Sequence, residues 1–129
     1  MASIFSRIVN GEIPCYKIAE TDQFLAFLDV RPQAKGHTLV IPKKEVDYIF
    51  DNDDETIAAM FVFAKKVGLA IEKVVPCVRI GIAVIGLEVP HTHVHLIPMN
   101  SMKDMKFNNS VEIPADEMRE LAAKIAAQV

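Results

Sequence analysis

Three of the four histidines in this chain stand at alternate positions, in the run His91-Thr92-His93-Val94-His95. Alternate residues of a strand project to one face, so a strand here would set the three imidazoles in one row. Imidazole is neutral and nucleophilic near pH 7, and a phosphoryl group is wide enough to meet a central nucleophile and two flanking partners. The spacing therefore predicts chemistry on phosphorus, with the central histidine facing the phosphorus atom.

Two other interpretations of the row stay open. His91 and His93 could together hold a metal ion, although no carboxylate or cysteine stands at a ligand spacing nearby. The row could also be three exposed histidines without a role. We expect phosphoryl chemistry and no metal.

Asp29 and His37 are further candidates for the same site. Asp29 ends the apolar run 24–28, where it either forms a turn or accepts hydrogen bonds from the vicinal hydroxyls of a ribose. His37 is the fourth histidine and follows Gly36 at the head of another apolar run. Taken alone, His37 is a surface or capping residue.

Length, charge and cysteine content restrict the class of protein. A chain of 129 residues fits one domain, here 1–129, and its net charge of −3 argues against a nucleic-acid partner. Cys15 and Cys77 are interpreted as buried thiols of a reducing compartment. The sequence shows neither a signal peptide nor an apolar run of about 20 residues, so we expect a cytoplasmic protein with no membrane partner.

The elements that would position these residues are short strands and a few helices. Apolar runs bounded by Gly, Pro and Asp predict strands at 16–20, 24–29, 37–41, 78–85 and 91–99. Helices are predicted over 3–10, between the acidic residues 51–55 and Pro76, and after Pro114. Because strands mostly follow one another directly, an antiparallel α+β fold is favoured over parallel winding.

The central helix has a wide apolar face. Asp53 or Asp54 can cap its first turn. The predicted buried stripe is Ile57, Met60, Phe61, Ala64, Val67, Gly68, Ile71 and Val75. Val62 and Phe63 widen this stripe beyond one sheet contact, which predicts a homodimer. For the last helix, the predicted buried face is Met118, Leu121, Ala122, Ile125 and Val129.

Four segments, in order along the chain, resemble the histidine-triad (HIT) family and its Hint branch. The segment 91–97 matches the family signature of three histidines alternating with mainly apolar residues. The other three segments, 4–14, 27–34 and 36–44, resemble the Hint branch. The resemblance covers about residues 3–99. It implies a HIT-like antiparallel five-stranded sheet with two main helices, assembled as a homodimer.

The resemblance also implies hydrolysis or transfer at the α-phosphate of a nucleotide, with no cofactor and no metal. His93 would form a nucleotidyl-histidine, His95 would contact the phosphate or leaving group, and His91 would orient the row. His37 matches the family's additional histidine, and Asp29 matches the acid that binds ribose. The apolar pocket for the base, in a purine mononucleotide, is matched by Ile4, Phe5, Ile8, Ile13 and Phe27.

Besides Thr92, which stands at a usually apolar position of the signature, the chain departs from the family in two groups of residues. Leu87 and Glu88 stand where members carry polar residues that hold the phosphate. Ser3, Ser6 and Glu45 replace residues that bind structural zinc in some members, so we expect no such zinc. Two functions are therefore predicted: a phosphoramidase-like nucleotide hydrolase acting on a nucleoside phosphoramidate, or a nucleotide-binding regulatory protein with little catalytic activity.

Overall fold

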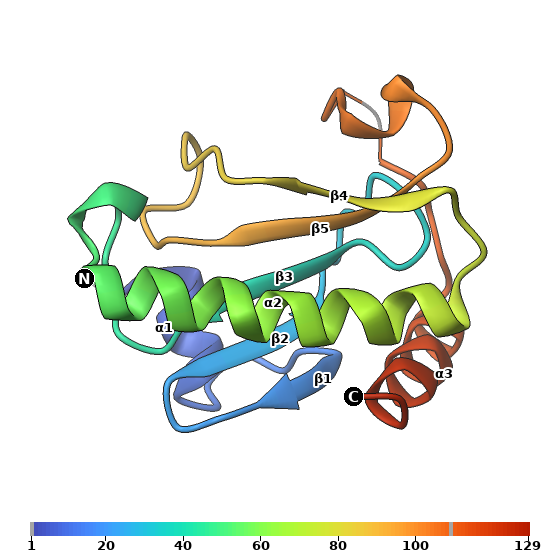
Figure 1. Ribbon diagram of the computed structural model, residues 1–129. Coiled ribbons are helices and arrows are strands. Elements are labelled where there is room, and N and C mark those ends of the chain that lie inside the picture. The colour runs from blue at the N-terminus through green and yellow to red at the C-terminus, as the bar shows by residue number, and fades with distance from the viewer. Residues whose placement is uncertain (1, 109) are drawn as a thin grey trace.

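The computed structural model describes residues 2–108 and 110–129, which form a five-stranded antiparallel sheet with two main helices. The sheet order is β1-β2-β3-β5-β4, and α2 runs across one face of it (Figure 1). The elements are α1 (Ile4–Val9), β1 (Lys17–Glu20), β2 (Phe24–Leu28), β3 (Thr38–Pro42), α2 (Asp54–Val74), β4 (Arg79–Ala83), β5 (Val94–Met99) and α3 (Ala115–Ala126), with 3-10 turns η1 (Ile49–Asp51) and η2 (Met102–Met105). The α+β architecture predicted from the sequence is confirmed.

Helix α2 begins where the acidic cluster predicts. The Asp53 carboxylate caps it by accepting a hydrogen bond from the Thr56 N–H at 2.7 Å. The predicted stripe is wrong at Phe61, which lies on the outer face with 36% exposure, and Ile57 is only partly buried. Phe63 takes the inward position instead, 7% exposed and stacked on Phe24 at 5.8 Å. Because Phe61, Val62 and Phe63 are all apolar, the sequence allows more than one choice of buried face for α2. Packing of Phe63 against Phe24 of β2 decides which face is buried.

The sheet separates two apolar cores because successive strand residues point to opposite faces. In β2, Phe24, Ala26 and Leu28 pack with α2 and α3, whereas Leu25 and Phe27 pack with Phe5 of α1. The second core is much smaller than the first. It leaves room on the α1 side of the sheet, opposite α2, for a ligand site.

Strand β5 is shorter than predicted, which corrects the view that the three histidines share one strand. It begins at Val94, so only His95 lies within it, and His91 and His93 precede it. The preceding segment is bound to another part of the chain: the Thr92 N–H donates to the Val46 carbonyl at 2.7 Å. The Asn52 side chain donates to the Thr92 hydroxyl at 3.0 Å. These contacts replace strand pairing and bury all three histidines.

Strand β3 and helix α3 also differ from prediction at their ends. Strand β3 runs from Thr38 to Pro42, so Pro42 is the last residue of the strand and not the residue after it. Helix α3 ends at Ala126, which leaves Val129 53% exposed rather than on the buried face. None of the described helices is long and apolar enough to cross a membrane.

Candidate active site

A cavity of about 820 Å³ lies on the α1 side of the sheet. Its walls include His37, His95, Asp29 and all of the residues predicted for the base pocket, namely Ile4, Phe5, Ile8, Ile13 and Phe27. His93 lies directly beside this wall, its ring 5.0 Å from Phe5 and 4.9 Å from His95. His91 lies deeper and is fully buried. The structure thus brings every predicted site residue to one location.

The protonation pattern of His93 is set by its own backbone neighbour. Nδ1 of His93 lies 2.7 Å from the carbonyl oxygen of His91, and a carbonyl can only accept. In the neutral ring the proton is therefore on Nδ1, and Nε2 keeps its lone pair. His93 is held as the tautomer a nucleophile needs.

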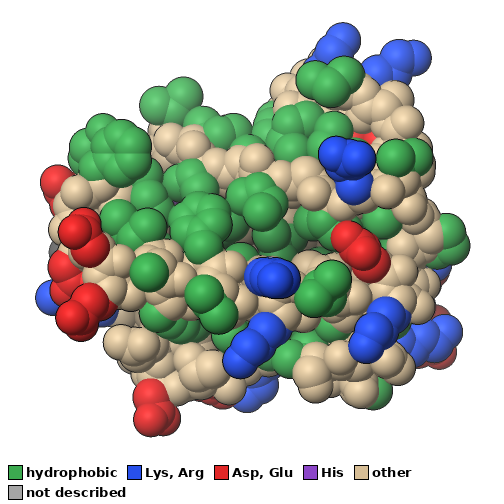
Figure 2. Space-filling model, viewed as in Figure 1, with side chains coloured by type: hydrophobic (Ala, Val, Ile, Leu, Met, Phe, Trp, Pro, Cys, Tyr) green, Lys and Arg blue, Asp and Glu red, His purple; other side chains and the backbone are tan. Residues whose placement is uncertain are grey.

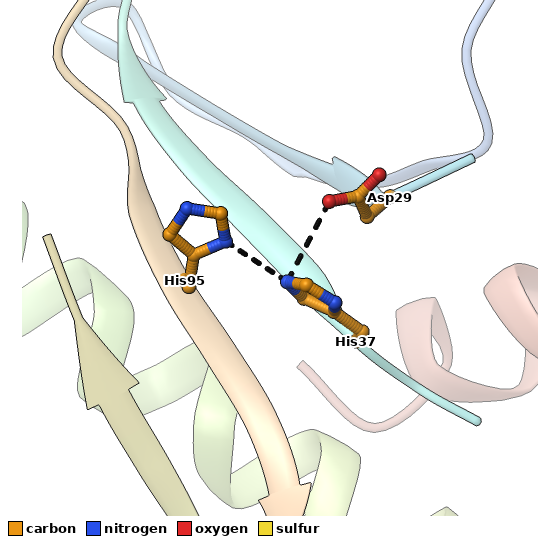
Figure 3. A group of neighbouring side chains, drawn as sticks. All are labelled: Asp29, His37 and His95. Atoms are coloured by element: carbon orange, nitrogen blue, oxygen red, sulfur yellow. Dashed lines mark hydrogen bonds and ion pairs between the residues drawn. The ribbon is translucent and has the colours of Figure 1, made fainter. Parts of the chain in front are cut away.

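His37 and His95 form a polarised pair (Figure 3). The Gln33 N–H donates to Nδ1 of His37 at 2.9 Å, so the proton of neutral His37 is on Nε2. Nε2–H of His37 then donates to Nδ1 of His95, also at 2.9 Å. His95 must consequently carry its proton on Nε2. One backbone N–H thus fixes two tautomers in series and makes His95 Nε2 a hydrogen-bond donor.

Both members of this pair stay neutral near pH 7. Burial, with smaller contributions from His95 and His93, lowers the pKa of His37 to about 3. Burial and then His93 lower the pKa of His95 to about 4. Neutral rings are required for the tautomer series, since a protonated His95 has no acceptor for the His37 N–H.

His91 anchors the site rather than facing it. Its Nε2–H donates to the Pro42 carbonyl at 2.7 Å, and its Nδ1 accepts from the Ser3 hydroxyl at 2.8 Å. Burial lowers the pKa of His91, against opposing effects of Pro42 and Glu45. The carbonyl of His91 orients His93, while its ring joins β3 to the N-cap of α1.

A polar cluster of Ser3, Ser6 and Glu45 surrounds the outer side of His91. The Glu45 carboxylate accepts hydrogen bonds from the Ser3 N–H at 2.6 Å and the Ser6 hydroxyl at 2.7 Å. These contacts, the Ser3 N–H first, lower the pKa of Glu45 to about 2. The cluster fixes α1, and with it Phe5, against the histidines.

Asp29 lies next to the histidine pair at the end of β2. One carboxylate oxygen accepts from the Arg31 N–H at 2.9 Å, and the other lies 3.6 Å from Nε2 of His37. The second distance is too long for a hydrogen bond, and because His37 is neutral the contact is not an ion pair either. Burial raises the pKa of Asp29, with the Arg31 N–H opposing. The free oxygen remains available to a ligand hydroxyl.

Asp29, His37 and His95 have potential ligand atoms within 4.8 Å of one another, so their fit to a metal ion can be tested. A metal on Nε2 of His37 needs a lone pair there, and the Gln33 N–H holds the proton at that atom. The alternative pair of His91 and His93 fits no better, because both ring nitrogens of His91 are hydrogen-bonded. The donor set therefore suits hydrogen bonding to a ligand.

Several wall residues were not predicted from the sequence. Phe107 is the largest: its ring lies 4.9 Å from His95 and 6.2 Å from His37, edge to face with both. Arg31 and Gln33, from the β2–β3 connection, were also not predicted. Leu87 and Glu88, which the family resemblance puts where members hold the phosphate, do line the cavity. Gln33 acts through its backbone, which no side-chain pattern could indicate.

Comparison with known proteins assigns the family. The family model for the HIT domain matches residues 10–102, most of the chain. The chain belongs to the HIT family. The HIT assignment confirms the resemblance of the alternating histidines and the segments before them.

Related proteins match three quarters or more of the HIT chain. A HIT-like protein of unknown role from Borreliella burgdorferi is 34% identical and spans 98% of this chain and 97% of its own. An adenosine 5'-monophosphoramidase of Schizosaccharomyces pombe is 43% identical over 76% of this chain and 74% of its own. A crystal structure of a Hit-like protein from Bartonella henselae superposes with a TM-score of 0.86 at 32% identity, covering 98% and 96%.

Proposed function

We propose that this HIT protein is a nucleotide hydrolase or transferase that acts at the α-phosphate of a nucleoside phosphoramidate. The observation that carries the proposal is the tautomer of His93, whose Nδ1 is hydrogen-bonded to the His91 carbonyl and whose Nε2 lone pair is free. The name of the yeast relative, an adenosine 5'-monophosphoramidase, supports the same substrate class.

The reaction follows from the hydrogen-bonding roles of His93 and His95. Nε2 of His93 attacks phosphorus and the P–N bond breaks, while Nε2–H of neutral His95 donates a hydrogen bond to the departing nitrogen, which takes up a proton from solvent water and leaves as the amine. Water then attacks the nucleotidyl-histidine and gives one proton back to the solvent, and free His93 and the nucleoside monophosphate are released. His37 holds His95 in the donating tautomer throughout.

The charges of the cavity favour an uncharged leaving group over a polyphosphate. Among its described wall residues the only basic side chain is Arg31, whereas Asp29 and Glu88 are acidic. The low pKa values of His37 and His95 keep both rings neutral at pH 7. A phosphoramidate brings one negative charge into this cavity, and a second or third phosphate would meet no further cation.

The base and ribose would occupy the end of the cavity formed by α1 and β2. Phe5 and Phe27 meet edge to face at 5.7 Å and provide an apolar surface for a purine ring. Asp29 is placed to accept hydrogen bonds from the ribose hydroxyls. We infer a purine mononucleotide as the bound portion of the substrate.

Intact-mass analysis after mixing with adenosine 5'-phosphoramidate tests the catalytic proposal. The wild-type protein should release AMP and show a transient mass increase of one adenylyl group. His93→Gly should show neither, while retaining nucleotide binding by calorimetry. Wild-type protein that binds AMP but yields neither turnover nor adduct with several amine leaving groups would favour the regulatory, nucleotide-binding alternative. The apolar side chains of Ile85 and Leu87 in the cavity wall give that alternative its support.

We also propose that the protein forms a homodimer through the outer face of α2. Apolar side chains gather along α2 and the sheet edge beside it (Figure 2). The exposed members of this face include Val62 at 59%, Leu69 at 50% and, on edge strand β4, Ile82 at 52%. Equilibrium sedimentation should show a dimer at micromolar concentration, and Val62→Asp should weaken it. A stable wild-type monomer would refute the proposal.

A further inference from the structure

The segment after β5 reaches back to the active site, and hydrogen bonds hold it on both sides of Phe107. On one side, the Asp104 carboxylate accepts the N–H groups of Asn100 and Ser101, at 2.8 and 3.1 Å, and fixes turn η2. On the other side, the Val111 N–H donates to the Pro32 carbonyl at 2.8 Å. Between these anchors, Phe107 enters the wall of the cavity.

Phe107 occupies an unusual backbone conformation in order to do so. Its φ is +58°, in the left-handed region that a bulky side chain rarely adopts. Such strain persists only where surrounding contacts hold it, and it is concentrated at functional sites. Here the contacts are the two imidazoles: the Phe107 ring meets His95 at 73° and His37 at 76°.

The ring contacts place Phe107 next to His95. The His95 ring contacts both His93 and Phe107, with ring centroids 4.9 Å apart in each case, and Phe107 also contacts His37. Displacement at phosphorus proceeds in line, so the leaving group departs on the side away from the attacking atom of His93. Of the aromatic wall residues, Phe5 contacts the attacking His93, whereas Phe107 contacts His95, the residue proposed to meet the leaving group.

We propose that Phe107 is a specificity-determining residue that forms the wall of the leaving-group subsite and favours amines with a flat, aromatic substituent. This inference rests on the proposed phosphoramidase function. The family model ends at residue 102, so Phe107 lies beyond the matched region. An aromatic leaving group would displace water from the Phe107 ring and pack against it. The base would bind separately, at Phe5 and Phe27.

Steady-state kinetics with two substrates test the inference. One is adenosine 5'-phosphoramidate with an unsubstituted amine, and the other carries an aryl group on the same nitrogen. For Phe107→Ala we expect kcat/KM to fall roughly five- to tenfold further on the aryl substrate than on the unsubstituted one. Phe107→Leu, which keeps apolar bulk without the ring, should lie between wild type and Phe107→Ala.

Met102→Ala is the matched control, since Met102 is in the same segment, is 77% exposed and is not in the cavity wall. It should leave both substrates within about twofold of wild type. Equal losses on both substrates for Phe107→Ala, or no loss on either, would overturn the leaving-group assignment while the phosphoramidase function stands. Wild-type protein inactive on both substrates would overturn the function and the inference together.

Discussion

Acidification should destabilise this protein well above the pH at which its carboxylates become protonated. The cause is the buried histidine pair, with a pKa of about 3 for His37 and about 4 for His95 in the folded chain. In the unfolded chain both have an ordinary pKa near 6.5. The unfolded state therefore binds more protons than the folded state below about pH 6.5. Stability must then fall as the pH drops from about 6.5 toward 4.

The expected loss follows from the two pKa differences. Between pH 6.5 and pH 4.5 an unfolded histidine becomes almost fully protonated, while each buried ring stays mainly neutral. Linkage then gives about 2 kcal/mol for each residue, or about 4 kcal/mol for the pair. A domain of this size has a free energy of unfolding of about 5–15 kcal/mol, so the loss is a large fraction of the total.

Urea denaturation at fixed protein concentration, repeated from pH 4.5 to 7, measures this loss directly. His37→Gln is the informative variant, because the Gln amide can replace the Nε2–H donor of His37 but does not titrate. We expect the variant to lose only about half as much stability over the same interval. A wild-type stability that is flat across this range would refute the argument. So would a pH dependence that is unchanged in His37→Gln.

Three further perturbations test other parts of the site. Ser3→Ala removes the N-cap of α1 and the donor to His91, and should lower the free energy of unfolding by about 1–3 kcal/mol in urea titrations. Gly36→Ala should cost about 1–3 kcal/mol, because φ is +93° and a Cβ would meet Val75 at 3.0 Å. Its control, Gly11→Ala, shares a positive φ but has open space, so an equal loss would contradict the packing contribution. Asp29→Asn should raise KM roughly tenfold for a ribonucleotide substrate and leave KM unchanged for its 2',3'-dideoxy analogue; equal effects on both would remove Asp29 from ribose recognition.

Much of the fold could be predicted because the apolar runs are short and clearly interrupted. Each strand lies within or close to its predicted span, and Asp53 caps α2 as its position indicates. The errors arise where a residue's role depends on distant parts of the chain. His93 is outside β5 because Thr92 is bonded to Val46 and Asn52, more than 35 positions earlier, a contact that no local pattern contains.

In the candidate site, the side chains that come together could be predicted, but the backbone hydrogen bonds that set their protonation could not. The histidine spacing and the apolar positions identified which residues gather around the cavity. The tautomers could not be predicted, since they depend on the Gln33 N–H and the His91 carbonyl. Phe107 was missed because its segment has no periodic pattern, and its direction depends on a positive φ and on the Val111 to Pro32 hydrogen bond.

Strands β3 and β5 pair at the centre of the sheet but lie far apart in sequence, and this affects how the protein acquires activity. Strands β1, β2 and β3 form a local meander, whereas β3 must pair with β5 across the whole of α2, and His37 meets His95 from 58 positions away. Closing so large a loop is slow and costs chain entropy before any contact repays it. We therefore expect the histidine pair to form at a late stage of folding. A chain that has formed its meander but not this closure lacks the hydrogen bond that sets the His95 tautomer, so recovery of the proposed activity during refolding would report completion of the sheet.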